Sequence, residues 1–306
     1  MKRKILKILI LSIIIFSNCN SNEKKSTSSL PIIVTTTGML ADAVENIVGD
    51  SAKVSALMGP GVDPHLYKAS QGDLTQLTNA DIIIYNGLHL EGKMGEVLEN
   101  LGRLRPVIAG GEGIPKEKIR NSTQYKNAYD PHVWFDVSLW QIVVQYLSTE
   151  LQNLHPANAD YYKNNTNLFL DQLDSLHQKV THSIATIPDQ QKILITAHDA
   201  FEYFGDAYGI EVKGLQGIST VSEFGLRDIT DLVDFIVEKQ IKAVFVETSV
   251  SKKAINAVVE GCNNKGFKVL IGGSLYSDAM GEKNTPEGTY IGMVNKNVTT
   301  ITNALK

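Results

Sequence analysis

The stretch that decides the expected fold is residues 156–188, PANADYYKNNTNLFLDQLDSLHQKVTHSIATIP, which has a proline at each end. Its apolar side chains recur in steps of three and four residues, which places them on one stripe of a helix. The members of this stripe are Phe169, Leu173, Leu176, Val180, Ile184 and Ile187. A helix of about 30 residues, at ~1.5 Å rise per residue, spans roughly 45 Å. We therefore predict one long, stiff helix, and we expect the parts that it joins to move only modestly.

On both sides of this stretch, short β-branched runs alternate with amphipathic segments, a pattern typical of parallel strands linked by helices. Strands are expected at residues 31–36, 53–58, 81–85 and 106–109, and then at 192–196, 211–213, 242–247 and 268–271. Helices are expected at 39–48, at 70–78 with Ser70 as the cap, near 200–208, 226–239 and 251–264, and at the C-terminus. We predict an α/β fold with two lobes, each a roughly four-stranded parallel sheet flanked by helices. The expected boundaries are 31–153 for the first lobe, 154–188 for the linker helix and 189–306 for the second lobe.

The N-terminus has the pattern of an export signal. Residues 1–18 carry four basic side chains and no acid, and the apolar run at 8–16 is too short to span a bilayer. Cys19 follows, and residues 19–30 have the polar composition of a flexible tether. The pattern resembles a lipoprotein signal, so we expect acylation of Cys19 and an extracytoplasmic, lipid-anchored protein. An uncleaved anchor or a plain secreted protein is the alternative. The other cysteine, Cys262, is expected to be a lone thiol.

The charge balance argues against one class of partner. The formal net charge is −4, and without the four N-terminal cations 25 basic side chains face 33 acidic ones, for a net charge of −8. An acidic body gives no electrostatic reason to bind nucleic acid, and it suits a protein that attracts cations.

Three histidines and one aspartate follow expected strand ends, where open α/β sheets bind their ligands. They are His65, His132, His198 and Asp278. The first two stand in Asp-Pro-His tripeptides, in which proline restricts the backbone just before the imidazole. Three imidazole nitrogens and one carboxylate are a normal ligand set for zinc. Glu247, at the end of an expected strand, and His89 are candidates to orient these four side chains by hydrogen bonds without touching the metal.

Several segments carry a resemblance that covers residues 31–306. They are GPGVDPHLY at 59–67, NGLHLE at 86–91, DPHVWFDV at 130–137, TAHDAFEYFGDAYG at 196–209, GISTVSE at 217–223 and SLYSDAMG at 274–281. In these segments the chain resembles the zinc and manganese receptors of ABC importers, lipoproteins with two lobes joined by one rigid helix. The resemblance implies that His65, His132, His198 and Asp278 bind the metal. It also implies that the protein, expected to be a monomer, delivers the ion to a membrane permease.

The resemblance leaves zinc and manganese both open as the cargo. Histidine at the position of His198 is frequent in zinc and dual-specificity members, whereas the histidine-rich loop of many zinc receptors is missing from residues 113–130. A nitrogen-rich ligand set intrinsically favours zinc over manganese.

Two other classes of function remain as alternatives. A zinc hydrolase needs an open coordination position and a general base, and no His-Glu-x-x-His stretch exists in the chain. A surface adhesin on the same scaffold would leave no readable motif. The metal-receptor interpretation therefore predicts a protein that is not an enzyme.

Overall fold

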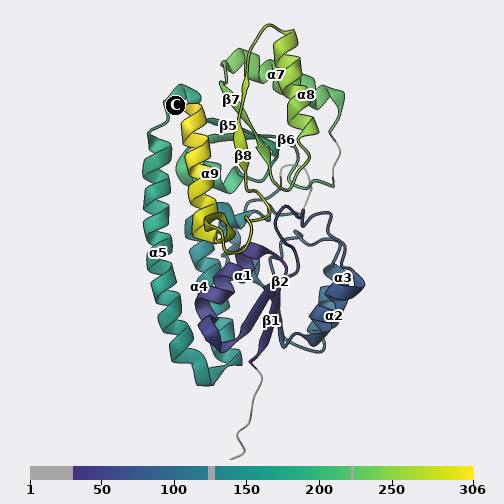
Figure 1. The fold of residues 1–306 in the computed structure, drawn as a ribbon, viewed down its shortest axis with the longest axis vertical. Coiled ribbons are helices and arrows are strands. Elements are labelled where there is room, and N and C mark those ends of the chain that lie inside the picture. The colour runs from purple at the N-terminus through teal and green to yellow at the C-terminus, as the bar shows by residue number, and fades with distance from the viewer. Residues whose placement is uncertain (1–29, 123–127, 222–223) are drawn as a thin grey trace, which may run out of the picture.

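The computed structural model describes residues 30–122, 128–221 and 224–306 and shows an α/β protein with one long helix along one side (Figure 1). The predicted signal peptide, Cys19 and all of the predicted tether except Leu30 lie outside the described residues. In the part of the chain that is described, none of the helices combines the length and the apolar content needed to cross a membrane.

The first lobe contains the expected four-stranded parallel sheet. Its strands are ordered β2-β1-β3-β4, and Ile33 at the centre pairs with Val54 on one side and Ile82 on the other. The strands are β1 (Ile32–Thr35), β2 (Lys53–Ala56), β3 (Ile82–Tyr85) and β4 (Val107–Ala109). All four lie within the predicted ranges.

The helices α1 (Gly38–Val48), α2 (Gln71–Asn79) and α3 (Gly95–Gly102) belong to the same lobe. Ser70 caps α2, as predicted, in a reciprocal arrangement. The Asp73 backbone N–H donates to Ser70 Oγ at 3.3 Å, and the Ser70 N–H donates to Asp73 Oδ2 at 2.7 Å. The sequence pattern had suggested α1 and α2 but not α3.

A second helix missing from the prediction is α4 (Val137–Leu154), which packs along the long helix. Its centre, Trp140-Gln141-Ile142-Val143-Val144, is rich in residues that local propensity assigns to strands. Tertiary burial overrides that propensity, because Trp140, Val143 and Val144 are almost fully buried and the Trp140 ring stacks on Tyr290 of the C-terminal helix.

The long helix predicted from the sequence is α5 (Ala159–Ala185), and a 3-10 turn at Pro156–Asn158 precedes it. Its 27 residues, at ~1.5 Å each, span on the order of 40 Å. The predicted apolar stripe is buried and continues back to Thr166 and Tyr162. In Figure 1 the helix runs along one side of both lobes, and α9 (Tyr290–Leu305) lies beside it.

The second lobe has the four expected strands, hydrogen-bonded as two parallel pairs, β5-β6 and β7-β8, rather than as one continuous sheet. The strands are β5 (Ile193–His198), β6 (Glu211–Gln216), β7 (Ala243–Glu247) and β8 (Leu270–Leu275). The helices are α6 (Glu202–Tyr208), α7 (Leu226–Lys239), α8 (Lys253–Asn264) and α9. Other 3-10 turns occur at Gly49–Ser51, Gly110–Gly113, Lys116–Lys118, Val133–Phe135, Asp189–Gln191 and Pro286–Gly288.

The last strand lies later than expected, at Leu270–Leu275 instead of 268–271. The sequence pattern did not predict the strand beyond residue 271, because Gly272 and Gly273 follow and glycine has low strand propensity. A glycine is required at the second position, where φ is +149° and a Cβ atom would lie 2.5 Å from Thr300 Cγ2 on α9. The shift brings the end of the strand closer to Asp278.

Candidate metal centre

The structure brings together the four side chains that the sequence predicted to share a site. His65 comes from the loop after β2 and His132 from the turn before α4, whereas His198 ends β5 and Asp278 follows β8. One ligand atom from each residue lies within 4.8 Å of the others, and all four residues are buried. Each lobe thus contributes two of the four.

The spacing of these atoms suits a single ion. His65 Nε2 lies 3.2 Å from His132 Nε2, and the Asp278 oxygens lie 3.3 Å from His198 Nε2, 3.5 Å from His132 Nε2 and 3.9 Å from His65 Nε2. Donors placed about 2.0–2.2 Å from a common ion stand roughly 3.3–3.6 Å apart in a tetrahedron. Three of these four separations lie close to that range, and the His65 to Asp278 distance is a few tenths of an ångström longer.

The two Asp-Pro-His tripeptides adopt the same turn. The carboxylate of Asp63 accepts a hydrogen bond from the His65 backbone N–H at 2.9 Å, and the carboxylate of Asp130 accepts one from the His132 N–H at 3.0 Å. Such aspartate turns fix the backbone of the residue two positions later. The aspartates therefore restrict the backbone that presents each imidazole, in addition to the restriction from the prolines.

Two imidazoles are oriented by carboxylates behind them. His132 Nδ1 lies 2.7 Å from Asp130 Oδ1, and His198 Nδ1 lies 2.5 Å from Glu247 Oε2. A carboxylate at Nδ1 favours a proton on that nitrogen, so Nε2 is the atom that can bind an ion at the centre. Glu247 was a candidate for this position, whereas Asp130 was not recognised, although its place in the repeated tripeptide pointed to it.

The electrostatic surroundings shift the pKa values of the buried groups in different directions. Burial lowers the pKa of His65 to about 3, so its imidazole is neutral at pH 7. Burial also opposes charge on His198, but Glu247 and Asp278 outweigh it and raise the pKa of that histidine. Burial would raise the pKa of Asp278, yet His198 and the other two imidazoles hold it well below its ordinary value. The centre therefore keeps an anion in the protein interior.

Three atoms at the centre are buried without a hydrogen-bond partner: His198 Nε2 and both oxygens of Asp278. Orphaned polar atoms are rare in protein interiors because each one costs free energy. A dication among them would satisfy all three at once. The donor set, three nitrogens and a carboxylate, suits zinc and also accepts manganese.

Trp134 connects the two halves of the centre. Its indole ring lies 5.3 Å from the ring of His132, and its Nε1–H donates to the Ser277 carbonyl oxygen at 3.0 Å. That carbonyl immediately precedes Asp278. A side chain of the first lobe thus positions the loop that carries the carboxylate of the second.

His89 lies on the surface, with a left-handed backbone at φ +66°. Among the described residues, no hydrogen bond joins its side chain to the four clustered residues. Its neighbour Glu91 is buried instead and accepts hydrogen bonds from Thr36 Oγ1 at 2.6 Å and from the Asn86 N–H at 2.7 Å. The carboxylate that orders this loop is therefore Glu91, which the sequence pattern did not single out. Cys262 is a free, buried thiol in α8.

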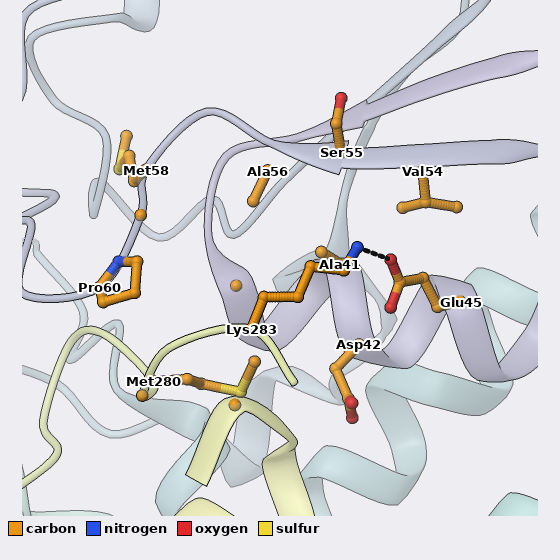
Figure 2. Close-up of a pocket in the computed structure, with 14 residues that line it drawn as sticks. Ala41, Asp42, Glu45, Val54, Ser55, Ala56, Met58, Pro60, Met280 and Lys283 are labelled. Carbon is orange, nitrogen blue, oxygen red and sulfur yellow. Dashed lines mark hydrogen bonds and ion pairs between the residues drawn. The ribbon is translucent and has the colours of Figure 1, made fainter. Parts of the chain in front are cut away.

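A cavity of about 310 Å³ lies between α1, β2 and the segment that follows Asp278. Figure 2 shows Lys283 reaching Glu45 across it, with Met280 and Met58 on its walls and Asp42 on α1. The Lys283 Nζ to Glu45 Oε1 distance is 3.2 Å. The cavity has no histidine in its lining and is separate from the four clustered residues.

The sequence matches a known protein family and is similar to individual proteins. Residues 33–304 match the family model described as zinc-uptake complex component A, periplasmic. The chain is 49% identical to the manganese-binding lipoprotein MntA of Bacillus subtilis over the whole of both sequences. It is 44% identical to the zinc-binding protein TroA of Treponema pallidum, over 95% of this chain and 94% of that protein.

The fold is shared with solved structures as well. The periplasmic zinc-binding protein TroA from Treponema pallidum superposes with a TM-score of 0.88 and 46% identity, over 90% of this chain and 99% of that one. This similarity confirms the predicted two-lobed α/β architecture.

Proposed function

Because the chain belongs to the zinc-uptake complex component A family, whose members are substrate-binding proteins of metal ABC importers, we propose that it captures one divalent transition-metal ion and delivers it to a membrane permease. The cargo is bound between the lobes by His65, His132, His198 and Asp278. Residues 31–153 and 189–306 each supply two of these ligands, and residues 154–188 set their separation.

One observation carries this proposal: the two lobes bring four buried side chains of metal-ligating type together, and three atoms among them, His198 Nε2 and both Asp278 oxygens, have no hydrogen-bond partner. Asp130 and Glu247 stand directly behind two of the imidazoles. With Asp278 they form three buried carboxylates, which offset the charge of a dication in a place where water cannot. The same carboxylates select a cation over any anion.

The cargo is zinc or manganese. MntA of Bacillus subtilis is named for manganese and TroA of Treponema pallidum for zinc, and this chain is similar to both. Three nitrogen ligands favour zinc in affinity, whereas supply in the cell decides which ion arrives. Competition titrations of both ions on the same preparation distinguish these outcomes.

The protein is proposed to act outside the cytoplasm, held to the membrane by a lipid on Cys19. The name of the related MntA includes the word lipoprotein, and an apolar run precedes Cys19 in this sequence. Cys19→Ala should release the chain from the membrane fraction or block its processing. Unchanged membrane association and unchanged processing would together refute the lipid anchor.

We propose that the chain is a receptor and not an enzyme. Members of its family are substrate-binding proteins, and four protein ligands close the coordination sphere that a hydrolytic zinc must keep partly open. Ester or peptide hydrolysis that disappears with a chelator would contradict this assignment.

The central test is a metal titration followed by thermal unfolding. We expect one tight dication per chain and a rise in melting temperature, because ligands from both lobes come together only in the folded protein. At a free metal concentration about 1,000 times Kd, the gain in unfolding free energy should approach ~4 kcal/mol. Two or more tight ions per chain, or no stabilisation, would exclude the four-ligand site.

A further inference from the structure

Two loops from opposite lobes meet beside the metal centre, and one side-chain hydrogen bond joins them. Asp63 lies in the loop between β2 and α2, and Thr220 lies in the loop after β6. The Thr220 hydroxyl donates to Asp63 Oδ2 at 2.6 Å, across 157 residues of sequence. This bond connects the lobe of His65 and His132 to the lobe of His198 and Asp278.

The same carboxylate also holds a metal ligand. The second oxygen of Asp63, Oδ1, accepts the hydrogen bond from the His65 backbone N–H at 2.9 Å. One oxygen thus fixes the turn that presents the imidazole, while the other binds the opposite lobe. A movement of the His65 turn therefore disturbs the contact with Thr220.

Thr220 is tied in turn to the strand beside His198. The Gln216 side-chain amide donates to the Thr220 carbonyl oxygen at 2.8 Å, and Gln216 is the partner of His198 in the β5-β6 ladder. The hydrogen bond between the loops therefore links two ligand-bearing segments, one in each lobe.

The contact lies nearer the molecular surface than the four clustered residues do. His65 is 4% exposed, the most of the four ligands. Leu66, which follows His65, and Val221, which follows Thr220, are each 49% exposed. The backbone also approaches the other lobe here, since a Cβ atom on Gly61 would lie 3.4 Å from the Thr248 carbonyl oxygen. Departure of the ion on this side requires the two loops to separate.

We propose that Asp63 and Thr220 form a strap across the metal site and that this strap sets the rate at which the ion is released. Both residues act as positioning residues and do not touch the ion. The inference rests on the proposed function and adds to it the element that retains the cargo. Whether the lobes part or the His65 turn swings outward, the strap must break before the ion leaves.

The strap predicts a specific kinetic signature. A hydrogen bond to a carboxylate is stronger than one between neutral groups. In the proposal this bond breaks while the ion leaves, and a variant that lacks the bond still has all four ligands. Its removal should therefore accelerate release and leave the association rate nearly unchanged. A general loss of stability would instead lower the melting temperature of the metal-free protein without this kinetic change.

Thr220→Val tests the strap because valine has the shape of threonine but no hydroxyl. The full-length chain, purified in detergent and loaded with zinc or with manganese, is mixed with excess chelator, and release is followed by stopped flow. We expect release from Thr220→Val to be about ten-fold faster than from the wild type. Thr220→Ser keeps the hydroxyl and should restore slow release.

Thr166→Val is the matched control, since its hydroxyl lies 2.7 Å from Ser148 Oγ in a buried contact between α5 and α4, away from the metal site. This variant should lower the melting temperature and leave the release rate unchanged. Equal release from the wild type and Thr220→Val, or equal acceleration by Thr166→Val, would overturn the strap alone. A wild-type chain that binds no dication would overturn the proposed function, and the strap with it.

Discussion

Asp278 and Asp42 are both buried carboxylates, 2% and 8% exposed, and each has at least one oxygen without a hydrogen-bond partner. Their surroundings differ. Asp278 lies 3.3 Å from His198 Nε2 and close to two further imidazoles. Asp42 lines the cavity of Figure 2, where the Tyr290 backbone N–H is its hydrogen-bond donor.

The two groups respond to burial in opposite ways. Burial raises the pKa of Asp42 to about 7. At Asp278 burial acts in the same direction, but His198 and its two neighbours overcome it and hold the pKa well below the ordinary value. The comparison teaches that burial alone neutralises a carboxylate, whereas burial among imidazoles keeps it charged and available to a cation.

The largest effect is expected at Asp278. Asp278→Asn keeps the shape but removes the charge and one oxygen ligand, so the affinity for zinc and for manganese should fall on the order of 100-fold or more, beyond the loss typical of an orienting residue. Competition against a metal indicator measures it. Asp42→Asn is the matched control and should bind within about three-fold of the wild type, because Asp42 is not one of the four clustered residues. Wild-type affinity in Asp278→Asn would show that Asp278 is not a ligand.

A smaller effect, visible as a change in preference, is expected at His198. His198→Glu makes the ligand set two nitrogens and two carboxylates, which should lower zinc affinity relative to manganese by about ten-fold while binding survives. His198→Ala supplies no replacement and should weaken both ions. Competition titrations of the two variants with both metals check the pattern. If His198→Ala left both affinities intact, His198 would not be a ligand, and Glu247 would be the next residue to test.

Asp42 should affect stability and not binding. Because its pKa is 3.8 when unfolded and about 7 when folded, the folded state retains a proton between these values that the unfolded state has lost. Stability therefore falls as pH rises from 4 to 7, by about 3–4 kcal/mol in total, and stays lower above pH 7. Asp42→Asn should flatten this fall and raise the unfolding free energy at pH 8 by about 1–3 kcal/mol, because it removes a buried charge. The new amide N–H₂ finds no partner and keeps the gain below the full cost of that charge. Denaturant unfolding at pH 4.5 and pH 8 measures both, and an unchanged pH dependence would contradict the interpretation.

The smallest effect is expected from the ion pair beside Asp42. The Lys283 and Glu45 side chains are 77% and 44% exposed, so solvent screens their attraction. Lys283→Met should change the unfolding free energy by less than about 0.5 kcal/mol. Chemical denaturation checks this. A loss above ~1 kcal/mol would mean that the pair holds the segment after Asp278 in place.

Much of the fold was predictable because its signals are local. The spacing of Phe169, Leu173 and Leu176 specifies a helix stripe, since helix geometry repeats within a few residues. The same holds for Ser70, whose cap depends on the Asp73 side chain three positions later. Where the local signal conflicted with packing, prediction failed: α4 carries strand-forming residues that become helical because they are buried in the core.

For the candidate site, the sequence by itself determined which residues have side chains of metal-ligating type, because histidine, aspartate and the repeated Asp-Pro-His tripeptide can be recognised without any contact being known. Only the tertiary structure decided which carboxylate faces which imidazole. Asp130 and Glu247 reach Nδ1 of His132 and His198, Trp134 reaches the Asp278 loop, and Thr220 reaches Asp63. Except for Asp130, these pairs join segments 49 to 157 residues apart. Their distances are set by how two lobes pack against one helix, and no sequence period specifies that packing.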